Sequence, residues 1–248
     1  MPVTRNVAWD GRLEAFKGRD TGEFVALVAA VASACAECGL PVRPEEQLSL
    51  IVDITEGADG GGIEFLAFDT CICHRRCREP DLTLRTAAGA PDELKTIGAR
   101  LILGHPDRSG IRAVPVLAYT LAPVLTFREP GGELTSVLVS VLISHGFRLT
   151  MSSDYAEMLR HARDVHTSVS CTATEEGRVS LHINGERIHS QQLDPAAAGD
   201  AAWLEAAGRE GKILVISGDY LKITSTGVNI DAAARLGTLV TGNVSTAT

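Results

Sequence analysis

The apolar positions of the chain gather in short blocks separated by polar segments rich in Gly and Pro. The longest block, FVALVAAVASACAEC, predicts a buried helix over residues 21–38, because apolar and small side chains cover nearly its whole circumference. Asp20 and Glu23 suit the capping positions at its start, and Gly39 and Pro41 suit its end. Its fifteen residues span only about 22 Å as a helix, short of the ~30 Å core of a bilayer, so we expect no membrane contact.

Two further runs have the composition of paired strands. QLSLIVDITEG (47–57) and IEFLAFDTCIC (63–73) predict an antiparallel hairpin joined by a Gly-rich turn. A second helix is expected at PDELKTIGAR (91–100), which begins with Pro, followed by a short buried strand at LILG (101–104). The run VPVLAYTLAPVLTF (114–127) predicts extended chain whose two prolines limit its pairing.

Three segments of the first half resemble segments roughly 110–116 residues later, in the same order. The pairs are 22–42 with 132–150, 93–104 with 203–218, and 51–69 with 169–187. One ambiguity lies at LTSVLVSVLI (134–143), where the repeat favours a helix and the β-branched composition favours a strand. We adopt the helix, because three matches in register outweigh a local preference.

The repeat predicts an α+β fold of two tandem ferredoxin-like (split βαβ) halves, formed by internal duplication and packed through their apolar helices. The first half would cover residues 1–115 and the second 116–248, with an inserted helix near 152–166. Because the apolar helices have no clear polar face, one of them could instead form the contact of an oligomer.

Composition excludes some classes of function. A net charge of −8 argues against a nucleic-acid partner, since binders of nucleic acid present a basic face. The first residues lack the features of a signal peptide, which favours a cytoplasmic protein with reduced cysteines. The strong excess of Arg over Lys is typical of a bacterial genome rich in G and C. Motifs for classical dinucleotide binding, phosphate-loop NTPases, α/β-hydrolases and paired C-x2-C zinc knuckles are not found.

The run DTCICHRRCREPD (69–81) concentrates candidate chemistry. In a continuing strand Cys71 and Cys73 share a face, whereas His74 points away from them. A metal site there would need Cys77, together with His105 or Cys171 as a further ligand, and the spacing is not that of a standard knuckle. Nearby arginines offer a second interpretation, either as clamps for an anion or as cations that activate a thiol. A solvated strand end is the third.

Cys35 and Cys38 are three residues apart within the first predicted helix, so small buried packing accounts for them best. The predicted inserted helix places Glu157 and His161 on one face. Its two histidines lie about 140° apart around the helix and would not share a metal.

We therefore predict an enzyme of small-molecule metabolism, including specialised metabolism, that binds a polar or anionic metabolite between the two halves without a nucleotide cofactor. The alternatives are a non-catalytic partner subunit of an oligomeric enzyme and a metal-stabilised binding module. No metal ligands are assigned, and the cofactor stays open. Catalytic roles are assigned to thiol, imidazole and strand-end acid groups and substrate binding to guanidinium groups: Cys73, His74, His161, His105 and Asp219 for catalysis, and Arg75, Arg76 and Arg78 for binding.

Overall fold

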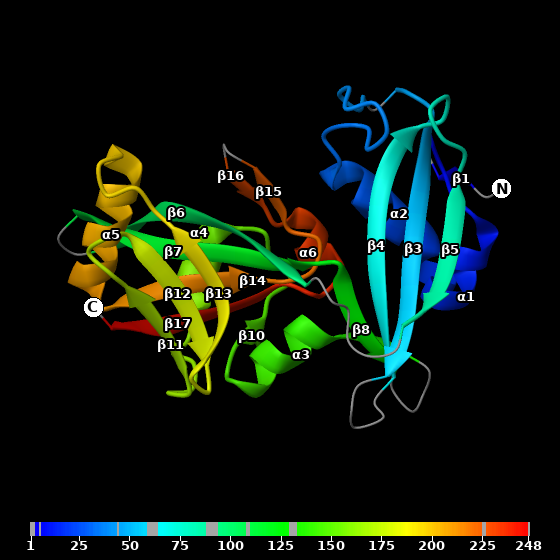
Figure 1. Cartoon of the computed structure of the whole chain (residues 1–248). Helices are drawn as coiled ribbons and strands as arrows, with labels where there is room; N and C mark the ends of the chain where they lie inside the picture. Colours follow the sequence, from blue (N-terminus) through cyan, green and yellow to red (C-terminus); the bar gives the residue numbers. More distant parts are fainter. Residues whose placement is uncertain are drawn as a thin grey trace. The chain divides into compact units, whose positions relative to one another are not determined.

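A computed structural model describes residues 3–4, 6–43, 45–58, 64–87, 94–107, 110–128, 133–224 and 227–247. The chain divides into two compact units, each with its own sheet (Figure 1). Unit 1 comprises Met1–Lys95 with Ala122–Val137, and unit 2 comprises Thr96–Leu121 with Leu138–Thr248.

Unit 1 is built on a mixed sheet. Its described strands run in the order β1-β2-β3-β4-β8-β9, and β5 also pairs with β3. The long β3/β4 hairpin, from Leu48↔His74 to Ala58↔Glu64, forms as the sequence predicts, because apolar and β-branched residues fill both strands. The predicted turn between them lies outside the described residues. The strands are β1 (Val3–Thr4), β2 (Val7–Ala8), β3 (Leu48–Ala58), β4 (Glu64–His74), β5 (Asp81–Thr86), β8 (Val124–Arg128) and β9 (Leu134–Ser136).

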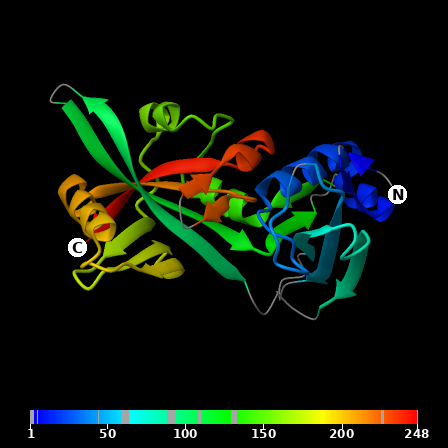
Figure 2. The same cartoon turned by 90° about the horizontal axis from the view of Figure 1, so that it is seen from above.

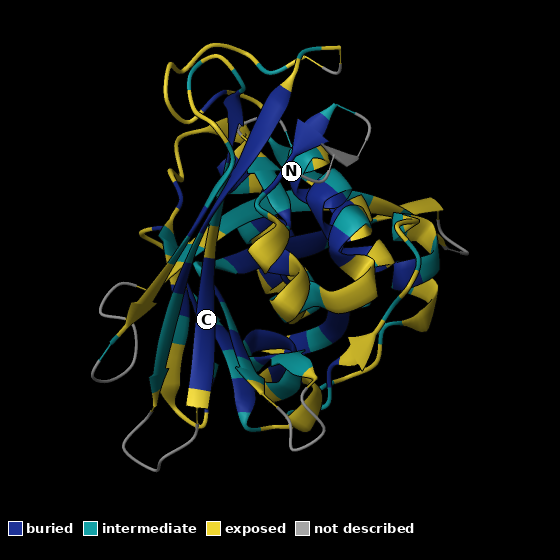
Figure 3. Cartoon of the chain, turned by 90° about the vertical axis from the view of Figure 1, so that its right-hand side faces the viewer, coloured by how far each residue is buried: buried dark blue, intermediate teal, exposed yellow. Residues whose placement is uncertain are grey.

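Short helices precede this sheet in the sequence. They are η1 (Gly11–Leu13), α1 (Glu14–Lys17), η2 (Gly18–Asp20) and α2 (Thr21–Val31). Phe16 packs edge-on against Phe68 of β4 with 6.3 Å between ring centroids, which joins the helical segment to the sheet. The segment from η1 to η2 is largely exposed on its outer side (Figure 3). The prediction of one helix to residue 38 is wrong, because α2 ends at Val31 and the chain continues as a loop.

Unit 2 contains a second mixed sheet and a small separate hairpin. Its described strands run in the order β13-β12-β11-β17-β14-β7-β6, with β10 also paired to β17. They are β6 (Lys95–Asp107), β7 (Gly110–Ala122), β10 (Arg148–Leu149), β11 (Val169–Ala173), β12 (Arg178–Ile183), β13 (Glu186–Gln192), β14 (Lys212–Ser217) and β17 (Val240–Ala247), with β15 (Lys222–Thr224) and β16 (Gly227–Asn229) forming the hairpin.

The middle of the unit 2 sheet, at β7 and β14, is buried on both faces. Alternate residues of β7 and β14 belong to two different cores, because side chains along a strand point to opposite faces. One core contains Trp203 of α5 (Ala198–Glu210) and residues of α3 (Val137–Ser144), and the other contains Met158 of α4 (Tyr155–His161) and residues of α6 (Asp231–Arg235). Figure 2 shows α4 and α5 on opposite sides of β14 and β17.

The predicted fold, an α+β duplication of ferredoxin-like halves, is wrong. Strands predominate, in two large mixed sheets of different strand order. Residues 95–100, predicted to be helical, lie in strand β6, where pairing with β7 overrides their local helix propensity. The supposed counterpart of the first helix at 132–150 divides into β9, α3 and β10. The repeated pattern therefore reflects similar composition and not a repeated structure.

Candidate metal centre

Four side chains of unit 1 converge on one point. Cys35, Cys38, His74 and Cys77 each offer one ligand atom, and these four atoms lie within 4.8 Å of one another. The Nδ1 atom of His74 is 3.4 Å from Sγ of Cys38 and 3.9 Å from Sγ of Cys77. A tetrahedral zinc ion, with Zn–S of about 2.3 Å and Zn–N of about 2.0–2.1 Å, separates such atoms by about 3.6 Å. The observed spacing therefore suits a single ion.

The first two ligands lie on a tight loop after α2. The backbone N–H of Cys35 donates to the carbonyl of Leu40 (2.8 Å), and the N–H of Gly39 donates to the carbonyl of Cys35 (2.8 Å). Gly39 has a φ of +71°, a left-handed conformation that glycine adopts without a steric penalty. A bond of 3.0 Å from the N–H of Ala36 to the carbonyl of Ile72 attaches this loop to β4. Cys35 and Cys38 are thereby turned toward the end of that strand.

The other two ligands come from the end of β4 and the turn that follows it. His74 is the last residue of β4, and the N–H of Cys77 donates back to its carbonyl at 2.8 Å. The N–H of Arg75 donates to the carbonyl of Gln47 at 2.8 Å, which attaches the start of the turn to the residue just before β3. This turn places the Cys77 thiol beside the ring of His74.

Glu46 orients the buried ring of His74. The Nε2 atom lies 3.1 Å from Oε2 of Glu46 and 3.3 Å from the carbonyl oxygen of Pro41, so a proton on Nε2 has two acceptors. Nδ1 then faces the thiols with its lone pair. The N–H of Arg43 donates to the same carboxylate at 3.1 Å, and this hydrogen bond lowers the pKa of Glu46. A carboxylate that holds the second nitrogen of a histidine is the usual outer support of a metal site.

The thiols differ strongly in acidity. Burial raises the pKa of Cys35, but the backbone N–H groups of Cys38, His74 and Glu37 outweigh it and bring this pKa down to about 6. Burial, followed by the neighbouring thiols of Cys38 and Cys35, raises the pKa of Cys77 to about 11. Thiolates this close repel one another, and a bound cation removes that repulsion.

Two other cysteines of β4 lie beside the four ligands without joining them. Cys73 is buried and packs with Cys35 in a small apolar cluster, where Cys71 is a partly buried neighbour. Burial raises the pKa of both thiols, that of Cys73 to about 11. A raised pKa keeps both thiols protonated, which does not favour a nucleophilic thiolate at either position. The two further ligands considered from the sequence, His105 and Cys171, belong to unit 2.

Acidic neighbours flank the predicted substrate-binding arginines. Arg75 forms an ion pair of 2.7 Å with Glu79, and Arg78 lies 3.7 Å from Asp81. Arg76 is exposed on the turn between them. The flanking acids thus take up part of the charge that the sequence suggested for an anionic ligand.

The remaining predicted catalytic residues lie in unit 2 and do not form one group. His105 lies near the last residues of β6, just before the start of β7 in the sequence. Asp219 is buried just after β14, whose last residue Ser217 pairs with Tyr119 near the other end of β7. Since a strand rises about 3.3 Å per residue, β7 keeps these two side chains far apart. His161, the last residue of α4, lines a different cavity.

The prediction that Cys35 and Cys38 share a helix face is wrong, because both follow the end of α2. The signal that identifies them is nevertheless present in the sequence. A C-x2-C pair followed directly by Gly39 has a partner in H-x2-C at His74 and Cys77, and the two pairs together supply four zinc ligands.

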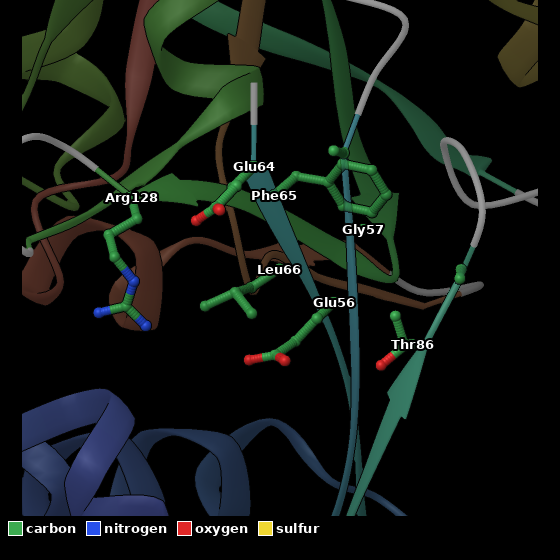
Figure 4. A pocket seen from close by; sticks show the side chains of 9 residues that line it. Glu56, Gly57, Glu64, Phe65, Leu66, Thr86 and Arg128 are labelled. Atoms are coloured by element: carbon green, nitrogen blue, oxygen red, sulfur yellow. The ribbon is translucent and has the colours of Figure 1, made fainter. Parts of the chain in front are cut away.

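Unit 1 also contains a cavity of about 370 Å³ near the other end of the β3/β4 hairpin. Figure 4 shows Glu56, Glu64 and Leu66 on one side of the strands, together with Arg128 from β8, and Phe65 on the other side. This lining mixes both charges with apolar surface and includes none of the four clustered ligands.

Comparison with family models, with curated proteins and with solved structures finds no match to this chain. The geometry of its own residues is therefore the basis for a functional assignment.

Proposed function

We propose that unit 1 is a zinc-binding module in which Cys35, Cys38, His74 and Cys77 hold one Zn²⁺. The observation that carries this proposal is the approach of three sulfur atoms and one imidazole nitrogen to within 4.8 Å. The orientation of His74 by Glu46 supports it independently, because that contact directs the free nitrogen toward the thiols. Three thiolates and one imidazole at tetrahedral spacing suit zinc better than the harder ions Mg²⁺ or Ca²⁺.

The role of this zinc is structural. Four protein ligands complete a tetrahedral shell and leave no position for water or substrate, as in zinc sites that stabilise a fold. The apolar cluster around the ligands contains few residues: Cys35, Ile51 and Cys73 are buried, and a few partly buried neighbours pack against them. The ion would join the loop after α2 to the end of β4, and its binding free energy would contribute directly to folding of this region.

Metal analysis of the purified protein tests the proposal. We expect about one zinc per chain in the wild type, measured by inductively coupled plasma mass spectrometry after removal of loosely bound metal. Cys38→Ser should lose most of this zinc. Cys71→Ser is the matched control, because it removes a thiol of the same sequence neighbourhood that is not among the four ligands.

Two outcomes would overturn the proposal. One is a wild-type protein, expressed in zinc-supplemented medium, that carries no zinc. The other is equal loss of zinc from the Cys38→Ser and Cys71→Ser variants, since this would show that the metal is not held by the proposed four residues. Circular dichroism of both variants separates loss of a ligand from general unfolding.

This assignment gives His74 a different task from the one predicted from the sequence. A nitrogen that binds zinc cannot serve in proton transfer, so we propose metal ligation for His74 in place of catalysis. The enzyme acting on a polar or anionic metabolite stays a prediction, as does an oligomer formed through an apolar helix.

The proposal also concerns the location of the protein in the cell and its partners. Within the described ranges, no helix has the length and hydropathy that crossing a bilayer requires. We infer a cytoplasmic setting, because zinc-bound thiolates persist where cysteines are kept reduced. We also infer that nucleic acid is not the partner, since the net charge of −8 opposes its approach.

A further inference from the structure

A second candidate site lies in unit 2, in a cavity of about 640 Å³ bounded by β10, the chain that follows it, α4 and β17. Three basic side chains line it, from Arg148, His161 and Arg163. The lining carboxylate is that of Glu157. The site is separate from the zinc ligands, which all belong to unit 1.

Strand β17 brings the two arginines together. Arg148 pairs with Thr241, and two residues further along the same strand Asp164 bridges to Asn243. The N–H of Asn243 donates to the carbonyl of Arg163 at 2.8 Å, which fixes that residue beside the strand. Two residues of strand span about 7 Å, so both guanidinium groups reach one small ligand.

Helix α4 adds the imidazole. Asp154 caps the helix by accepting a bond of 2.8 Å from the N–H of Ala156, and Met158 is buried in the core beneath it. With the helix held in this way, Glu157 and His161, one turn apart, both face the cavity. The imidazole therefore lies on a fixed element and not on a loop.

The charge of this cavity is not balanced. Among residues with described side chains, no carboxylate lies within ion-pair distance of Arg148 or Arg163. The nearest acidic residue in sequence, Asp164, is paired with Lys212 at 2.7 Å. Two guanidinium groups in one hollow repel each other, and an anion that accepts hydrogen bonds from both relieves this repulsion.

Two hydroxyl groups at the cavity are prepared to donate. Oγ of Ser152 accepts from the N–H of Asp154 (3.2 Å), and Oγ1 of Thr150 accepts from the N–H of Ser152 (3.3 Å). Since each oxygen already accepts from a backbone group, its proton remains for a ligand. Both residues line the cavity. Donors on several sides suit the oxygens of a phosphate or carboxylate.

Apolar side chains complete the lining. Leu149 and Met151 line the same cavity and are 51% and 69% exposed, so apolar surface lies in the open beside the basic groups. An inorganic ion would leave them in water, whereas the apolar part of an organic ligand would cover them. We propose that this cavity binds a small organic anion, with a phosphate or carboxylate at the arginines and an apolar group on Leu149 and Met151.

Isothermal titration calorimetry with phenyl phosphate tests this proposal, with phenylacetate and inorganic phosphate as comparison probes. Arg148→Ala and Arg163→Ala should each weaken phenyl phosphate binding about tenfold, the loss expected for one charge-assisted contact. Glu157→Gln should strengthen binding about threefold, because it removes the lining carboxylate. Arg160→Ala is the matched control: it removes a neighbouring exposed arginine outside the cavity lining and should change affinity less than about twofold.

Each outcome decides. Preference for phenyl phosphate over phenylacetate assigns the site to phosphates, and the reverse assigns it to carboxylates. The proposal is overturned if neither organic probe binds up to about 10 mM, if inorganic phosphate binds as well as both, or if Arg160→Ala weakens binding as much as Arg148→Ala and Arg163→Ala do. Thermal unfolding of each variant identifies misfolding. The Glu157→Gln variant tests the role of charge by an increase in affinity, which a misfolded protein would not show. The proposed zinc ligands lie in unit 1, so a failure of the zinc proposal would not change how these binding results in unit 2 are interpreted.

Discussion

At the scale of single residues, Glu46 decides how the imidazole of His74 is used. Its carboxylate lies 3.1 Å from Nε2 of His74 and accepts from the N–H of Arg43 at 3.1 Å. The carboxylate is therefore held from one side and holds the ring on the other. An imidazole with its Nε2 proton fixed in this way offers Nδ1 to a metal without first rotating or changing tautomer.

Replacing Glu46 by Ala should consequently weaken zinc binding without removing any ligand. We expect a loss of affinity of about 10- to 100-fold, the range found when such supporting groups are removed. Competition with a chromophoric chelator measures the change. Glu45→Ala is the control, because Glu45 is an exposed neighbour with the same charge. Equal affinities for the Glu46→Ala and Glu45→Ala variants would contradict this role.

At the scale of elements, the loop after α2 is a metal-binding turn whose shape depends on Gly39. Its φ of +71° lies in the left-handed region, and a Cβ built there meets no atom within 4 Å. The cost of a side chain at this position is therefore one of backbone strain and not of steric contact. Gly22, in the first turn of α2, also has open space around it but has no positive φ.

Alanine at the two glycines should have opposite effects. Gly39→Ala should lower the free energy of unfolding of the zinc-loaded unit 1 by about 1–2 kcal/mol, the cost of a left-handed conformation with a side chain. Gly22→Ala should raise it by up to about 1 kcal/mol, because alanine favours a helix. Urea unfolding followed by tryptophan fluorescence measures both. A Gly39→Ala variant that unfolds with the same or a higher free energy than the wild type would show that the conformation of Gly39 does not matter.

The elements of unit 1 differ in how well the sequence predicts them. The β3/β4 hairpin is predictable, because its apolar and β-branched runs dictate a buried strand pair. The end of α2 at Val31 is not, because ASACAEC contains no helix-breaking residue before Gly39. The helix stops where the N–H groups of Cys35 and Ala36 find partners in Leu40 and Ile72, and the latter partner is 36 positions away.

The candidate site was predictable to a similar extent. His74 and Cys77 stand out in the sequence as members of a Cys- and His-rich run. Treating Cys35 and Cys38 as helical removes them from consideration, and with them the second half of the ligand set. The prediction for residues 95–100 fails for the same reason. These residues have helical character locally and are extended only through the pairing of β6 with β7.

At the scale of the whole molecule, the two units should respond differently to removal of metal. The four ligands lie in unit 1, and each unit carries one of the two tryptophans, Trp9 in unit 1 and Trp203 in unit 2. Trp203 is fully buried, and its Nε1 donates to the carbonyl of Val116 at 3.0 Å, so its fluorescence reports the packing of the core of unit 2.

Chelation should thus destabilise unit 1 and leave unit 2 nearly unchanged. In a Trp9→Phe variant, the melting temperature reported by Trp203 should shift by less than about 2 °C on metal removal. Hydrogen exchange should meanwhile accelerate in residues 32–43 and 74–78, which the metal holds together. Equal destabilisation of both units would mean that zinc acts on more than the segment it joins.

X-ray absorption spectroscopy at the zinc edge tests the central claim most directly, because it reports the ligand atoms themselves. The arrangement of Cys35, Cys38, Cys77 and His74 predicts three sulfur atoms at about 2.3 Å and one nitrogen at about 2.0–2.1 Å. A first shell made mainly of oxygen and nitrogen, or one made of four sulfur atoms, would contradict it.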